Sequence, residues 1–163
     1  RTPRGCTKGQ VAGLKGPAAE IKEKWQSKVK QGQPMCGERI ASQPGLPTAL
    51  TGTTLTLEGQ TLEVHGGVQG DDAQCSYVWI PSIKTVVAGD IVYRGVHVWT
   101  AETNAASRKA WAKTLDELAA LKPVAVIPGH KDQKLANSSA VIDQTGKYLA
   151  AFNAPVARST GSC

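Results

Sequence analysis

Several features that would assign this chain to a particular class of protein are missing. No apolar run approaches the roughly 20 residues that a membrane-spanning helix needs. The chain opens on RTPRGCTKGQ, without the continuous apolar stretch of a secretory signal. Neither absence locates the protein, so periplasmic, secreted and cytoplasmic locations all stay open. The content of 40% hydrophobic and 20% charged residues is ordinary for a globular protein.

Common catalytic and binding motifs are also missing. Neither Gly-x-Gly-x-x-Gly nor a Walker pattern occurs, which disfavours a phosphate-binding glycine loop. No Gly-x-Ser-x-Gly elbow occurs, so a nucleophilic triad is poorly supported. The cysteines form no CxxC pair, which disfavours a zinc knuckle. Three disulfide pairings are conceivable if the protein is exported, and the sequence does not choose among them; the four cysteines are Cys6, Cys36, Cys75 and Cys163.

The chain carries a formal charge of +6, from 19 Lys and Arg against 13 Asp and Glu. The excess lies mostly in residues 1–30, where Glu20 and Glu23 are the only acidic residues. A basic arm could meet nucleic acid or an anionic surface. Because no aromatic-rich strand or nucleic-acid motif accompanies it, we interpret the run as a solvated helix face and expect no nucleic-acid partner.

Length and patterning predict one domain over residues 1–163. The pattern from Pro17 to Lys30 predicts an amphipathic helix, with Ile21, Trp25 and Val29 on one face. The predicted segments are, in order, a basic segment with this helix at 1–30, an irregular linker at 31–52, a folded half at 53–152 and a loose tail at 153–163.

The half at 53–152 alternates strand and helix patterns. A hairpin turns at Glu58-Gly59, and a second strand pair turns at Pro81-Ser82. A helix follows, with Thr103 as its expected cap and Pro123 ending it. The remaining predicted elements are a strand at Val124–Ile127 that Pro128 and Gly129 stop, and a helix at 138–152. This order predicts a mixed sheet packed against helices, in a layered α/β or α+β domain.

At three places, residues suited to chemistry follow predicted strands or turns. Asp90 follows TVVAG, His130 follows VIPG, and Asp71 with Asp72 follows GGVQG. Carboxylate and imidazole groups at one sheet edge suit zinc, iron or manganese. An aspartate after glycine is also a common turn former, since it tolerates unusual backbone geometry. His130 could equally be a catalytic base or a histidine that sits in a turn.

The other two histidines have weaker patterns. His65 lies within the strand LEVH, which favours a structural role. His97 lies in RGVHVWTAE, where it could line a pocket or pack under a loop. With Trp99 it offers a polar tip and an apolar surface, so His97 and Trp99 are the predicted wall of a substrate pocket.

Two of these stretches resemble one known family. IPSIKTVVAGDIVY resembles the strand pair of metallo-β-lactamase-fold hydrolases that leads to a metal-bridging aspartate, here Asp90. ALKPVAVIPGH resembles the later strand that ends in Pro-Gly-His, whose histidine binds the second metal, here His130. The helix between them has the family's expected length and placement. The resemblance covers roughly Thr53 to Phe152 and implies an αββα-type sandwich, apparently incomplete.

The chain departs from that family at two points. The His-x-His-x-Asp-His signature is absent, so the chain resembles the family's C-terminal portion. Counting back ten residues from Pro81, the family's isolated histidine ligand is replaced by Asp71, while another register would place Gln69 there. The resemblance therefore implies Asp71 as a third metal ligand, in an incomplete set.

The resemblance implies a metal-dependent hydrolase that uses a metal-bound hydroxide on a small-molecule substrate. We expect this chain to be a portion or a degenerate relative of such an enzyme, inactive on its own. The implied cofactor is zinc, as one or two ions, with iron or manganese as alternatives. The missing first half, or a homodimer partner, should cover the exposed sheet. The alternative is a metal-free relative that binds a ligand or a partner.

Overall fold

The computed structural model describes residues 30, 34, 37, 50 and 52–159. The chain divides into two compact units, residues 1–51 and 52–163, and the elements below all belong to the second. The predicted helix at 17–30 and the predicted linker at 31–52 therefore lie almost entirely outside the described residues, as do the last four residues of the predicted tail. The single-domain prediction stays a prediction.

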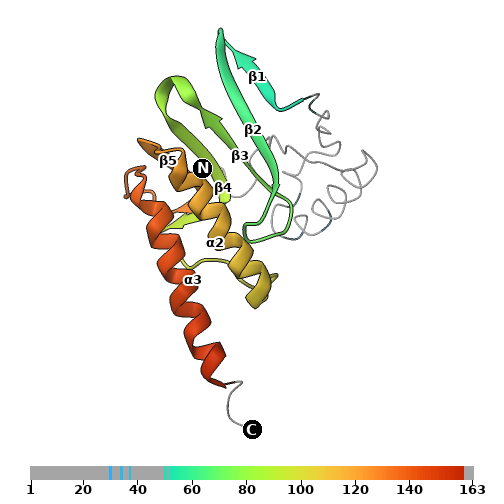
Figure 1. The fold of residues 1–163 in the computed structure, drawn as a ribbon, viewed down its shortest axis with the longest axis vertical. Helices are drawn as coiled ribbons and strands as arrows, with labels where there is room; N and C mark the ends of the chain where they lie inside the picture. Colours follow the sequence, from blue (N-terminus) through green and yellow to red (C-terminus); the bar gives the residue numbers. More distant parts are fainter. Residues whose placement is uncertain (1–29, 31–33, 35–36, 38–49, 51, 160–163) are drawn as a thin grey trace. The chain divides into compact units, whose positions relative to one another are not determined.

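A five-stranded mixed sheet forms the centre of the second unit, with its strands in chain order (Figure 1). Neighbours from β1 to β4 are antiparallel, whereas β5 is parallel to β4. A helix connects these last two strands, as a parallel crossover requires. The strands are β1 Thr54–Leu57, β2 Gln60–Val68, β3 Cys75–Ile80, β4 Thr85–Arg94 and β5 Ala125–Lys131.

Both predicted hairpins are confirmed. Glu58 and Gly59 have φ angles of 50° and 79°. Two positive φ angles in a two-residue loop match the right-handed twist of the flanking strands. The second connection is a short 3-10 helix, η2 (Pro81–Ile83), followed by Lys84 with a φ of 46°.

The two described helices are α2 (Ala105–Ala120) and α3 (Ala140–Ser159). The prediction of Thr103 as the cap of α2 is wrong. Asn104 accepts a hydrogen bond from the Ser107 amide and completes a capping box, while the Thr103 hydroxyl bonds to the Thr100 carbonyl. Neither helix is long and apolar enough to cross a membrane, and the same holds for the whole described part of the chain.

Helix α3 continues past the predicted end at Phe152 and reaches Ser159. The segment predicted as the start of a loose tail is therefore helical up to that residue. Ala151 and Ala154 favour the first part of this extension, because alanine loses no side-chain entropy on helix formation.

Both helices lie against one face of the sheet (Figure 1). Val86, Ala88 and Val126 point to that face and are fully buried. On the opposite face, the paired residues Val87 and Ile127 are each 36% exposed. The predicted α/β class, with helices packed on a mixed sheet, is confirmed.

Strand β5 does not stop at Ile127, so that prediction is wrong. It continues through Pro128 and Gly129 to Lys131, with register shifts against β4. Within the described sheet β5 is an edge strand, and edges and bulges are where a strand accommodates proline. His130 consequently lies within a strand, beside β4.

Candidate functional site

Asp90 and His130 are in direct contact. Nδ1 of His130 lies 2.8 Å from Oδ1 of Asp90, although 40 residues separate them in sequence. The parallel pairing of β4 and β5 brings the two positions together. The Asp90 side chain is 29% exposed and the His130 side chain is 61% exposed, so the pair is open to solvent. An ionised carboxylate only accepts hydrogen bonds, so Nδ1 of His130 is the donor in this contact.

Gly129 makes this contact possible. A Cβ atom built on Gly129 would collide with the Asp90 carboxylate and would lie 2.7 Å from the carbonyl carbon of Gly89. Glycine at this position lets the two backbones approach closely, a known use of glycine within strands.

Asp71 joins the same cluster through the loop between β2 and β3. Its Oδ2 accepts a 2.9 Å hydrogen bond from the Tyr93 hydroxyl, and its Oδ1 lies 3.5 Å from the Cys75 sulfur. Its backbone amide donates to the Asp90 carbonyl at 3.4 Å. Burial raises the pKa of Asp71, the hydrogen bond from Tyr93 lowers it, and the nearby Asp90 charge raises it further.

Two members of the cluster, Tyr93 and Cys75, were not predicted from the sequence. Tyr93 is 5% exposed, and its ring is stacked on His130 with centroids 5.4 Å apart. Burial raises its pKa, and so does the hydrogen bond to Asp71. Burial also raises the pKa of the Cys75 thiol, to about 12. The sequence carried no signal for Tyr93, because side chains three residues apart in a strand ordinarily point to opposite faces.

The donor types of this cluster suit a divalent metal, but the described residues do not complete a site. No group of three His, Cys, Asp or Glu side chains within residues 52–159 is arranged to hold an ion. A catalytic zinc takes three protein ligands and a water. Asp90 and His130 contact each other, and Asp71 contacts Tyr93 and Cys75. This part of the chain therefore offers an incomplete set of metal ligands.

The remaining candidates lie apart from this cluster. Nδ1 of His97 is 3.3 Å from the Tyr148 hydroxyl of α3, and Trp99 is 56% exposed. Their role as a pocket wall stays a prediction. His65 stacks on Tyr77 with centroids 4.6 Å apart, which agrees with the structural role expected for it.

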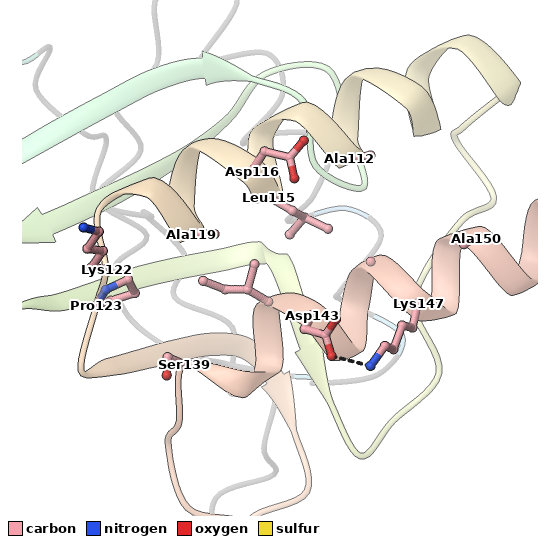
Figure 2. A pocket seen from close by; sticks show the side chains of 12 residues that line it. Ala112, Leu115, Asp116, Ala119, Lys122, Pro123, Ser139, Asp143, Lys147 and Ala150 are labelled. Carbon is pink, nitrogen blue, oxygen red and sulfur yellow. Dashed lines mark ion pairs between the residues drawn. The ribbon is translucent and has the colours of Figure 1, made fainter.

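An open groove lies between α2 and α3 (Figure 2). Ala112, Ala119 and Ala150 line it, and an ion pair of Lys147 with Asp143 lies at its side. It contains none of the candidate ligands, so it is not the candidate site.

Comparisons with known proteins agree on one family. The profile of the metallo-beta-lactamase superfamily matches residues 11–130. A search of curated proteins finds no match. Among solved structures, a metallo-beta-lactamase from Pontibacter korlensis is 22% identical, with a TM-score of 0.50 over 77% of this chain and 62% of that one.

Two further structures are similar in the same way. The DIM-1 metallo-beta-lactamase exposed to ceftazidime is 21% identical, with a TM-score of 0.51 over 82% of this chain and 62% of that one. A metallo-beta-lactamase family protein from Thermus thermophilus is 18% identical, with a TM-score of 0.51 over 83% of this chain and 48% of that one. This chain therefore spans less than two thirds of their lengths. At these identities the structures show a shared fold, and the profile match over most of the sequence shows the family: the chain belongs to the metallo-beta-lactamase superfamily.

Proposed function

We propose that this chain is a portion, or a degenerate relative, of a metal-dependent hydrolase. The observation that carries the proposal is the 2.8 Å contact between His130 and Asp90, on neighbouring parallel strands of a metallo-beta-lactamase fold. Superfamily membership supports hydrolytic chemistry of the metal-dependent kind, and this contact supports two side chains as its ligands.

In this proposal Asp90, His130 and Asp71 donate to the metal, and the set is completed by donors outside residues 52–159. Zinc suits this mixture of imidazole and carboxylate, and iron and manganese are the alternatives. When bound, such an ion lowers the pKa of a coordinated water toward ~7 and polarises the scissile group. The chain's own contribution is to hold the ligands: strand pairing sets their separation, and Gly129 allows their approach.

We propose that the open face of the sheet meets a partner. Val87 and Ile127 are neighbours in register and each is 36% exposed on the face opposite the helices. The occupant is the first half of the fold, supplied by the rest of a longer protein or by a second copy. This fits a chain that covers 62% of similar solved structures.

A second candidate is a metal-free relative that binds a small ligand or a partner. The contacts that Asp71 already makes within the chain favour this candidate. Where the family resemblance places a histidine, this chain has an aspartate that Tyr93 and Cys75 already contact. A carboxylate held in this way, beside an exposed His130, can recognise a polar ligand without a metal.

Metal content of the whole chain separates the two candidates. The protein is loaded with zinc, dialysed and analysed for bound metal, alongside the variants His130→Ala and Asp90→Asn. The control is His65→Ala, which removes an imidazole that stacks on Tyr77, outside the cluster. Retained zinc that is lost in both variants and kept in the control supports the hydrolase. Zinc retention that is absent, or equal in all four proteins, counts against metal binding by this chain and favours the metal-free relative.

A further inference from the structure

Both helices hold Tyr93 in place: α3 bonds its backbone, and α2 contacts its ring and the nearby Ile91 carbonyl. Its amide donates to the Thr145 hydroxyl of α3 at 3.2 Å. That hydroxyl in turn lies 3.3 Å from the Tyr93 carbonyl. From α2, Trp111 meets the Tyr93 ring edge-on at 6.3 Å and donates its indole N–H to the Ile91 carbonyl at 2.8 Å. Thr145 and Trp111 are almost fully buried, so this end of β4 is fixed to the core.

From this fixed position Tyr93 reaches two candidate ligands that come from different elements. Its hydroxyl donates to Asp71, in the β2–β3 loop, at 2.9 Å. Its ring lies parallel to the His130 ring, at an interplanar angle of 6°. His130 is itself in contact with Asp90. Tyr93 is thus a residue whose side chain contacts both Asp71 and His130, in addition to the backbone hydrogen bond from Asp71 to Asp90.

We infer that Tyr93 is a positioning residue that sets the orientation of both Asp71 and His130. The inference that this orientation serves metal binding rests on the proposed function, whereas the contacts of Tyr93 with Asp71 and His130 do not. The His130 side chain is 61% exposed, so without the stacked ring its imidazole would turn more freely. The Asp71 carboxylate would likewise lose a charge-assisted hydrogen bond, the stronger kind. Partners that orient a ligand in this way commonly change metal affinity by about 10–100-fold when they are removed.

Two substitutions separate the two contacts. Tyr93→Phe keeps the ring that stacks on His130 and removes the hydroxyl that bonds Asp71. Tyr93→Leu removes both. The matched control is Tyr148→Phe, which also removes one tyrosine hydroxyl but at a contact with His97.

The first readout is NMR of the metal-free chain, with the side-chain signals of Asp71 and His130 assigned. In Tyr93→Phe the Asp71 carboxyl signal should move and the His130 ring signals should stay. In Tyr93→Leu both should change, and in Tyr148→Phe neither should. An unmoved Asp71 signal in Tyr93→Phe, or an unmoved His130 ring in Tyr93→Leu, would overturn the inference. Thermal denaturation identifies a variant that is merely unfolded, and Tyr93→Phe, which keeps the buried ring, then decides alone.

The second readout is affinity for Co²⁺, followed by its visible absorption. We expect about a tenfold loss for Tyr93→Phe, a larger loss for Tyr93→Leu and no loss for the control. A wild-type chain that binds no Co²⁺ would count against the proposed function, and the NMR pattern would still test Tyr93. Equal affinity in wild type and Tyr93→Leu would overturn the positioning role.

Discussion

Replacing Gly129 by alanine tests how closely β4 and β5 must approach at the candidate site. The new methyl group would collide with the Asp90 carboxylate and would lie 2.7 Å from the Gly89 carbonyl carbon and 3.0 Å from the Asp90 nitrogen. Two of these three neighbours are backbone atoms, which cannot rotate away as a side chain can. The strands must therefore separate locally, and the 2.8 Å contact between His130 and Asp90 must open.

The expected loss of stability follows from overpacking. Added methyl groups in packed regions cost about 1–3 kcal/mol, because neighbouring backbone has to shift. At roughly 2–4 °C per kcal/mol for a chain near this size, Gly129→Ala should lower the melting temperature by about 2–12 °C. Gly146→Ala is the matched control. Its methyl group would meet only the Leu115 Cδ1 at 3.7 Å, an ordinary contact, inside helix α3. It should raise stability by about 0.5–1 kcal/mol, since alanine favours helix more than glycine does.

Thermal denaturation of the three proteins, together with NMR of the His130 ring, measures both effects. We expect Gly129→Ala to melt lower and to change the His130 signals, and Gly146→Ala to melt higher and to leave them unchanged. If Gly129→Ala melted with the wild type and left the His130 ring unchanged, the close approach of β4 and β5 would not be what holds this pair together.

Three further predictions concern Asp71, Cys75 and Asn104. Burial raises the pKa of Asp71 above its ordinary 3.8, so the folded state binds its proton more tightly than the unfolded chain does. Asp71→Asn should therefore raise the urea midpoint at pH 7, by a margin that shrinks as the pH falls toward 3.8; a lower midpoint at pH 7 would contradict this. The pKa of Cys75, about 12, should protect its thiol from iodoacetamide at about pH 8 until the protein is unfolded, as peptide mapping would show. Equal labelling of native and unfolded protein at that position would refute it. Asn104→Ala removes the cap of α2 and should cost about 1 kcal/mol in urea denaturation, and unchanged stability would show that the capping box contributes little.

The sequence predicted best those elements whose signals are local. The turn at Glu58-Gly59 was readable because alternating residues flank it and two residues of a tight hairpin need positive φ. The end of β5 could not be predicted from the sequence, because proline and glycine, here Pro128 and Gly129, ordinarily end a strand. Only the pairing with β4 shows that an edge strand continues through them. The cap of α2 was placed one residue early, since Thr103 and Asn104 are both good caps and the choice depends on Ser107.

The candidate site was predictable in part. Asp90 and His130 follow recognisable strand patterns, and the resemblance to one family paired them. The contact of Tyr93 with Asp71 joins residues 22 apart in sequence and depends on the path of the β2–β3 loop. No periodicity reports such a contact. Nor does periodicity explain Gly129, whose need for a missing Cβ appears only when β4 lies beside it.

The electrostatics of the cluster give the two candidate functions a common physical basis. The nearby charge of Asp90 raises the pKa of Asp71, and both side chains are partly buried. Two like charges held together in this way favour the uptake of positive charge. A divalent cation supplies it in a metallohydrolase, whereas in a metal-free relative the Tyr93 hydroxyl and the His130 imidazole are the partners of the two carboxylates. Zinc addition should therefore shift the carboxyl NMR signals of Asp71 and Asp90 if the chain is a metallohydrolase, and should leave them unchanged if it is a metal-free relative.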